Sequence, residues 1–155
     1  MRTRLNDDIK AAMKSGDKRR LATLRLITAT IKDRDLSAHV DEQGQATGRD
    51  KLADQDILAL LQKMIKQRRE SIEIYRKAGR DDLAEQEAEE IAVIEAYLPQ
   101  QMNEDEMRAA VAGLVADLNA KGLKDMGRVM AALKERYTGT MDFGKASAML
   151  KEALK

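Results

Sequence analysis

Residues 97–105, YLPQQMNED, divide the sequence into two sets of predicted helices. Pro99 is the only proline in the chain, and proline disfavours helical backbone in the residue before it. Asn103 and Glu106 follow at the spacing of a capping box, which begins a helix. One helix therefore ends before this stretch and another begins after it. We predict an N-terminal helical subdomain over residues 1–98 and a three-helix tail subdomain over residues 102–155.

Before this stretch, apolar residues recur every three or four positions in four segments, as on one face of an α-helix. Gly16 and Gly79 are predicted to end two of these helices. Asp17, Asp54 and the Asp82/Glu85 pair are predicted to cap the helices that follow. Residues 37–50, SAHVDEQGQATGRD, have no apolar period and predict an exposed loop. The predicted inward faces comprise Leu5, Ile9, Met13, Leu21, Leu24, Ile27, Ile31, Ile57, Leu61, Ile65, Ile72, Tyr75, Leu83, Ile91, Ile94 and Leu98, with Arg68 interrupting the third row.

After the dividing stretch, three shorter segments have the same helical period. Gly122 and Gly139 are predicted to end the first two, and Asp125 and Asp142 to cap the last two. No segment alternates at the period of a β-strand for long. The sequence therefore predicts an all-α, multihelical protein. The predicted core positions of the tail are Met107, Val111, Leu114, Leu118, Val129, Met130, Leu133, Tyr137, Phe143, Ala146, Leu150 and Leu154.

The composition excludes several classes of protein. The chain of 155 residues contains no cysteine, so disulfides and thiolate zinc sites are excluded. No apolar run approaches the roughly 18 residues of a membrane-spanning helix. The first residues are charged every few positions, which is unlike a secretory signal. We therefore expect a cytoplasmic protein that does not associate with membranes.

The net charge of +1 conceals an uneven distribution of charge. Residues 81–106 carry ten acidic and no basic side chains, and the segments on both sides are basic. Two interpretations remain open. Either the acidic helix packs beside an oppositely charged neighbour, or a basic surface is kept for a polyanion and the acidic helix steers or shields it.

Residues that would support catalysis are lacking. His39 is the only histidine and falls in the predicted loop, and no serine lies in a Gly-x-Ser-x-Gly sequence. Neither of the glycine-rich phosphate-binding loops is present. The acidic helix lacks the histidines of a di-metal carboxylate site. We predict no cofactor, no metal and no bond chemistry performed by the chain alone.

Residues 125–130, DMGRVM, admit a structural and a functional interpretation. In the first, Asp125 caps a helix, Gly127 lets another backbone approach, and Val129 and Met130 face the core. In the second, the N–H groups of the helix start act with Lys124 and Arg128 to hold phosphates of a folded RNA. Because the chain has only four aromatic residues, we expect recognition of shape and phosphate rather than base stacking. The candidate RNA-binding residues are Lys121, Lys124, Gly127, Arg128, Lys134, Arg136 and Lys145 in the tail, and Arg68, Arg69 and Arg80, with Arg76 and Lys77, before it.

Three stretches of the sequence are distinctive: DDIKAAMKSGDKRRLATLRLI near the start, KQRRESIEIYRKAGRDDLAEQEAEEIAVIEAYLPQQM in the middle, and DMGRVMAALKERYTGTMDFGKASAMLKEAL in the tail. Together they resemble the YqeY-like family over essentially the whole chain. The middle stretch is the most specific, with Gln67, Arg68, Ser71, Tyr75, Ala78-Gly79-Arg80, Leu83, Glu87, Glu90 and Tyr97-Leu98-Pro99 at the family's spacing. Arg128 stands where the family usually has lysine, and the two are not equivalent at a constrained site.

The resemblance implies a relation to the C-terminal helical region of the aspartyl/glutamyl-tRNA amidotransferase B subunit. That region is a non-catalytic appendage whose tail helps to hold tRNA. The resemblance therefore implies a helical bundle with a three-helix tail, and tRNA or another RNA as the partner. Two alternatives stay open. The chain is a protein-interaction module, for example for a tRNA-modifying or amidotransferase-related protein, or an accessory subunit of a carbon–nitrogen ligase with glutamine as amido donor.

Overall fold

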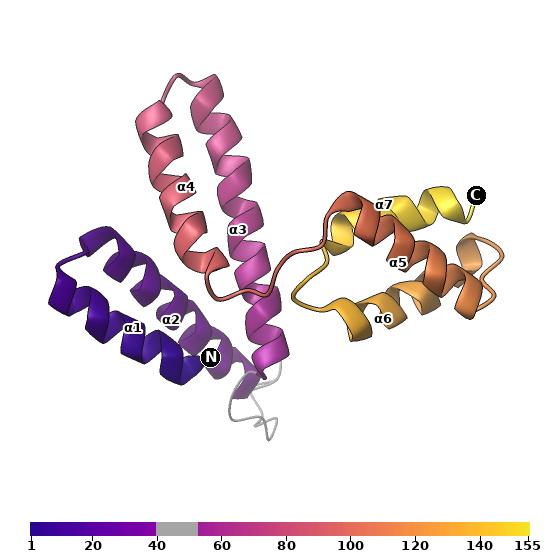
Figure 1. Cartoon of the computed structure of the whole chain (residues 1–155), viewed down its shortest axis with the longest axis horizontal. Coiled ribbons are helices and arrows are strands. Elements are labelled where there is room, and N and C mark those ends of the chain that lie inside the picture. Colours follow the sequence, from indigo (N-terminus) through magenta and orange to yellow (C-terminus); the bar gives the residue numbers. More distant parts are fainter. Residues whose placement is uncertain (40–52) are drawn as a thin grey trace. The chain divides into compact units, whose positions relative to one another are not determined.

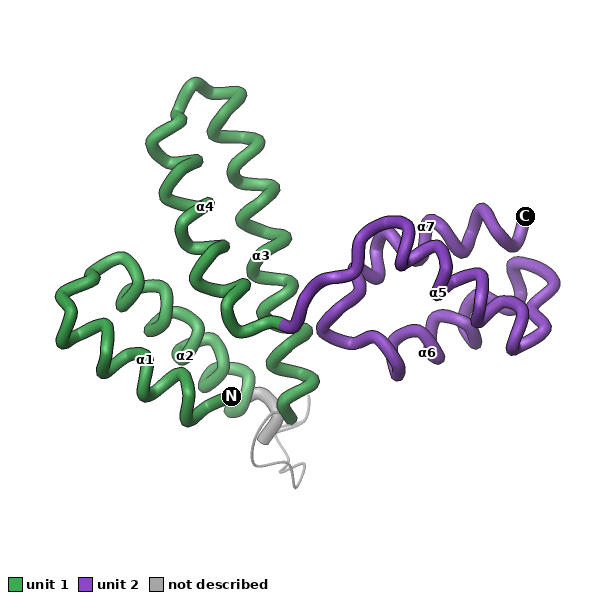
Figure 2. Tube along the Cα trace, in the orientation of Figure 1, with its two compact units in different colours: residues 1–98 green, residues 99–155 purple. Residues whose placement is uncertain are grey.

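The computed structural model describes residues 1–39 and 53–155, and every regular element within these ranges is a helix (Figure 1). The prediction of an all-α, multihelical protein is confirmed. The chain forms two compact units, residues 1–98 and residues 99–155 (Figure 2). Each unit has a hydrophobic core of its own.

The first hairpin of unit 1 joins α1 (Arg2–Ser15) to α2 (Lys18–His39). Gly16 ends α1 with a left-handed φ of 73°, and the Asp17 carboxylate accepts a hydrogen bond from the Arg20 N–H at 3.1 Å. Both features follow the sequence prediction, because glycine adopts positive φ without strain and aspartate caps helix starts. The loop predicted for residues 37–50 is wrong at its beginning, because α2 continues to His39. The remainder of that loop lies outside the described residues.

The second hairpin joins α3 (Asp54–Lys77) to α4 (Asp81–Glu95), and Gly79 turns between them with a φ of 73°. Two predicted caps are wrong. Asp54 is the first residue of α3 rather than its cap, and no side chain caps α4. The Asp82 carboxylate instead accepts hydrogen bonds from the Arg80 guanidinium at 3.2 Å.

The core of unit 1 lies where the two hairpins meet, since α2 packs on α1 and α4 while α3 packs mainly on α4. Its buried members include most of the predicted inward-facing residues. Met13 differs, because its side chain is half exposed. The core comprises Leu5, Ala12, Leu24, Ile27, Ile31, Ile57, Leu61, Met64, Ile65, Ile72, Ala84, Ile91, Ile94 and Tyr97.

Tyr97 links the end of α4 to α1. Its hydroxyl donates a hydrogen bond to the Asp8 carboxylate, and the Arg4 guanidinium lies 4.6 Å from the centre of its ring. Arg4 also donates to the Ala96 carbonyl at 2.9 Å. Burial and the bond to Asp8 raise the pKa of Tyr97 to about 12. The phenol therefore stays protonated and holds the helix end in place.

Unit 2 contains α5 (Glu104–Asp117), a single turn of 3₁₀ helix η1 (Leu123–Asp125), α6 (Met126–Tyr137) and α7 (Phe143–Ala153). The predicted caps of α5 and α7 are observed. The Asn103 side chain accepts from the Glu106 N–H at 2.8 Å, and the Asp142 carboxylate accepts from the N–H groups of Gly144 and Lys145 at 3.0 and 3.2 Å. The core comprises Met107, Val111, Leu114, Val129, Leu133, Met141, Ala146, Leu150 and Leu154.

The end of α5 differs from the prediction. Gly122 is extended, with a φ of −170°, and the helix has already ended at Asp117. Asn119 supplies the left-handed residue, with a φ of 52°. Asparagine tolerates this conformation because its short polar side chain can bond locally. Gly122 instead leads into η1.

Candidate nucleic-acid interface

Asp125 organises the start of α6. Its carboxylate accepts hydrogen bonds from the backbone N–H of Lys121 at 2.9 Å and from the Arg128 guanidinium at 3.2 Å. These two groups hold its pKa below the ordinary aspartate value. The predicted cap of α6 is therefore wrong, because no side chain caps this helix and the carboxylate is turned back toward the preceding turn. The backbone at Lys121 and the Arg128 guanidinium are therefore held beside one carboxylate.

Gly127 lies in the first turn of α6 and is exposed. A Cβ built at this position meets no atom within 4 Å. The expectation that Gly127 lets another part of the backbone approach is therefore wrong for the described chain. Its backbone is an open part of the surface.

The basic side chains of α6 point in more than one direction. Successive residues of an α-helix are rotated by about 100°, so Gly127, Ala131 and Lys134 lie on one face. Arg136 lies on roughly the opposite side of the helix from Lys134. Lys145 is exposed in the first turn of α7, and Lys121 and Lys124 are exposed before α6 begins. The start of α6 and its Lys134 face thus bring together most, but not all, of the tail candidates.

These tail cations differ in how they are paired. Arg128 is paired with Asp125. Among the described residues, no ion pair forms on the side chains of the other candidates, Lys121, Lys124, Lys134, Arg136 and Lys145. Their charge is directed to solvent.

Three candidates of unit 1, Arg68, Arg69 and Arg80, have acidic partners within the same unit. The Arg68 Nε lies 2.9 Å from a Glu90 carboxylate oxygen and 3.9 Å from one of Glu87, and the Arg68 side chain is only 12 % exposed. Arg69 pairs with Glu95 at 3.2 Å. Arg80 pairs with Asp82, also at 3.2 Å, while Arg76 and Lys77 are exposed at the end of α3. In these pairs, the acidic helix α4 packs beside oppositely charged neighbours, which is the first of the two interpretations left open by the sequence.

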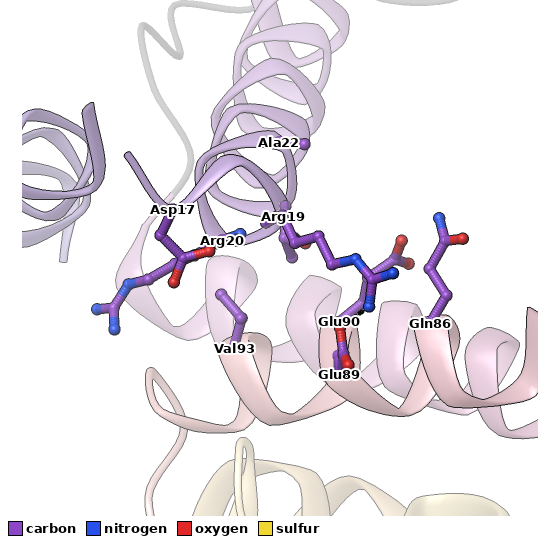
Figure 3. Close-up of a pocket in the computed structure, with 9 residues that line it drawn as sticks. Asp17, Arg19, Arg20, Ala22, Gln86, Glu89, Glu90 and Val93 are labelled. Atoms are coloured by element: carbon purple, nitrogen blue, oxygen red, sulfur yellow. Dashed lines mark hydrogen bonds and ion pairs between the residues drawn. The ribbon is translucent and has the colours of Figure 1, made fainter. Parts of the chain in front are cut away.

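A groove of about 350 Å³ between α2 and α4 was not predicted from the sequence. Figure 3 shows Arg19 of α2 extending toward Glu89 and Glu90 of α4, and the Arg19 guanidinium forms an ion pair with Glu89. Arg20 and Gln86 also line it. Arg19 and Glu89 neutralise one another across this groove, and Asp17 and Glu90 oppose Arg20, so its described lining gives a polyanion no basic surface.

Neither a metal site nor a membrane span is found in the described residues. No group of three or more His, Cys, Asp or Glu side chains in residues 1–39 and 53–155 is arranged to hold a metal ion. Over the same residues, no helix has the length and apolar character needed to cross a membrane.

The fold and this surface define a class of all-α proteins with two helical units, the second of which carries exposed cations around the start of a helix. The chain belongs to the Yqey-like protein family, which it matches over residues 2–154. The resemblance seen in the sequence is thereby confirmed.

Three relatives share the name "Altered inheritance of mitochondria protein 41, mitochondrial". The one from Eremothecium gossypii is 37 % identical over 95 residues, which cover 61 % of this chain and 46 % of the relative. The relative from Pyrenophora tritici-repentis is 33 % identical over 139 residues, which cover 86 % of this chain and 71 % of the relative. The relative from Lachancea thermotolerans is 36 % identical over 116 residues, which cover 74 % of this chain and 57 % of the relative. The chain thus spans about half the length of the first relative and little more than half of the third.

The expected cytoplasmic location is contradicted by these comparisons. The similar proteins from all three fungi are named as mitochondrial. The composition of the sequence could not reveal this, because the absence of a secretory or membrane-spanning segment does not distinguish between these compartments.

Proposed function

We propose that the chain binds a folded RNA, with tRNA as the first species to test, through the cationic surface of unit 2. The surface is defined by Lys121, Lys124, Gly127, Arg128 and Lys134. The observation that carries the proposal is the arrangement around Asp125, which bonds the backbone of Lys121 and the guanidinium of Arg128, next to the open backbone of Gly127 in the first turn of α6. Three lysines on this surface have no acidic partner among the described residues.

Phosphate is the chemical group that this surface suits best. The first N–H groups of α6 carry partial positive charge, and the Asp125 side chain does not cap them, although the Met126 N–H already donates to the Leu123 carbonyl. Lysine and arginine side chains beside such a helix start add full charges for the same ligand. Glu135, which is also exposed on α6, is the acidic residue next to Lys134 in the sequence.

Base stacking contributes little to this proposal. The chain has three tyrosines, one phenylalanine and no tryptophan. Tyr97 is buried, and Tyr75, Tyr137 and Phe143 are half-buried within or beside the two cores. No aromatic side chain is therefore free to stack on an unpaired base, which favours recognition of a folded RNA by its backbone.

The relation to the amidotransferase B subunit, implied by the resemblance, supports tRNA as the first RNA to test. We assign no reaction to the chain. A ligase activity would require a partner that supplies the catalytic groups.

Fluorescence anisotropy of labelled bulk tRNA, titrated with the full chain at low salt, tests this proposal. We expect K121E/K124E/K134E to weaken binding by at least about tenfold, because each lost phosphate contact removes favourable counterion release. K10E/K14E/K18E is the matched control, since it reverses three exposed lysines of unit 1. Circular dichroism checks that both variants remain helical. The proposal fails if the native chain does not bind tRNA, or if both triple variants lose the same affinity.

A further inference from the structure

A second groove, of about 280 Å³, lies between α2 and α3. These helices belong to different hairpins, and α3 packs mainly on α4 while α2 packs on α1 and α4 (Figure 1). The side chains between α2 and α3 are consequently left partly uncovered. The lining residues are Leu26, Thr30 and Arg34 of α2, and Leu60, Lys63, Met64, Gln67 and Arg68 of α3.

The floor of this groove is apolar. Leu26 is 45 % exposed, Leu60 is half-buried and Met64 is buried beneath them. Leu26, Thr30 and Arg34 are spaced by four residues, and Leu60, Met64 and Gln67 by four and three, so each helix contributes one continuous row. Two such rows with a depression between them are the surface into which the side chains of a third helix fit.

The charged side chains among the described residues that line this groove are all basic. Arg34 and Lys63 are exposed, and neither forms an ion pair with another described residue. Arg68 is already paired with Glu90 and Glu87 on its α4 side. No carboxylate is among the described residues that line the groove. An occupant with apolar residues on one face and acidic residues beside them would complement both properties.

We propose that the α2/α3 groove binds an amphipathic helix of a partner protein. The apolar face of that helix lies on Leu26, Leu60 and Met64, and its flanking Asp or Glu side chains pair with Arg34 and Lys63. A helix in a groove is a common mode of peptide recognition, with anchors spaced by three and four residues. Nucleic acid is the poorer occupant, because phosphates gain nothing from the exposed leucine and no aromatic side chain lines the groove.

Site-specific crosslinking identifies the occupant. A photoreactive phenylalanine analogue replaces Leu26 in the full chain, and crosslinked segments are sequenced by mass spectrometry after irradiation in cells. We expect a segment of another protein with apolar residues at helical spacing and acidic residues beside them. Crosslinks confined to this chain or to a second copy, crosslinks to RNA, or no crosslink at all would overturn the proposal.

Charge reversal then tests how the segment is bound. The crosslinked segment is synthesised as a peptide and titrated with the native chain, with R34E/K63E, and with K10E/K14E as a control of equal charge change. We expect R34E/K63E to lose at least tenfold in affinity and a peptide with lysines in place of its acidic residues to restore binding to that variant. L26S should also weaken binding, because it removes the apolar anchor. Equal affinity of all variants, or no rescue by the reversed peptide, would contradict the proposed mode. The crosslinking and peptide-binding results do not depend on whether unit 2 binds tRNA.

Discussion

Replacing Arg68 with methionine tests the ion pairs that join α3 to α4. Arg68 Nε contacts Glu90 at 2.9 Å and lies 3.9 Å from Glu87, in surroundings that leave the arginine side chain 12 % exposed. Methionine retains much of the apolar stem but removes the charge. The substitution therefore leaves two neighbouring carboxylates partly buried without their cation.

The size of the stability loss in R68M follows from the partial burial of these carboxylates. Removing one partner of a fully buried ion pair costs about 3–5 kcal/mol. The Glu87 and Glu90 side chains keep 23 % and 25 % of their exposure, so water screens part of the repulsion. We expect R68M to lower the free energy of unfolding of unit 1 by roughly 2 kcal/mol. For a unit of this size, that corresponds to a fall in Tm of roughly 10 °C.

Urea and thermal unfolding of the full chain at neutral pH, followed by circular dichroism, measure this loss. Hydrogen exchange in α3 and α4 assigns the affected transition to unit 1. R69M is the matched control, because it makes the same change one residue away in the well exposed pair between Arg69 and Glu95. Exposed pairs contribute about 0–1 kcal/mol. Equal losses in R68M and R69M would refute the reasoning.

The effect of R68M should also depend on pH. Burial and the neighbouring Glu90 raise the pKa of Glu87, and Arg68 lowers it. Without Arg68 the pKa of Glu87 rises further. A carboxyl whose pKa is raised in the folded state costs stability above that pKa, and the cost disappears as pH falls below the unfolded value. The deficit of R68M should therefore shrink on acidification, and E87Q/E90Q should restore stability to the variant at neutral pH. A deficit that is constant with pH would count against the assigned cause.

Three further substitutions have defined outcomes. The pKa of Tyr97 is raised to about 12, so the stability that its phenol contributes is fully present below the ordinary phenol pKa and is lost as pH rises toward 12. Y97F should therefore lose helical signal less steeply at alkaline pH than the native chain. Equal alkaline unfolding curves for the two proteins would contradict this. D142A should lower the stability of unit 2 by about 1 kcal/mol in urea unfolding, because the cap of α7 is lost, and an unchanged midpoint would contradict that role. G79A should lower the free energy of unfolding by about 1 kcal/mol because the φ of Gly79 is positive. G127A, in open helical backbone, should be neutral or stabilising, and a larger loss in G127A than in G79A would contradict this reasoning.

The sequence predicted those features that depend on neighbouring residues. Asn103 and Asp142 cap their helices because each side chain reaches an N–H two or three residues further along. Asp125 has the same chemistry but bonds the N–H of Lys121, because η1 folds that residue back toward it. Asp82 pairs with Arg80, two residues before it, and makes no side-chain cap of α4. A carboxylate with two available partners cannot be assigned from its spacing alone.

Features that depend on distant residues were not predictable. Arg68 was visible in the sequence as a break in an apolar row, but its partner Glu90 lies 22 residues away on the returning helix. The α2/α3 groove needs the arrangement of both hairpins, so the exposure of Leu26 could not be inferred from its helical spacing. The tail cations were identified from charge and spacing, and whether they bind RNA stays a prediction.

The salt dependence of tRNA affinity tests the central claim most directly. The logarithm of the association constant is measured against the logarithm of salt concentration for the native chain and for K121E/K124E/K134E. If the three lysines contact phosphates, the slope should be smaller in the variant by about 2 to 3, since each contact contributes roughly 0.7 to 0.9. An identical slope for both proteins would show that these side chains do not contact the RNA.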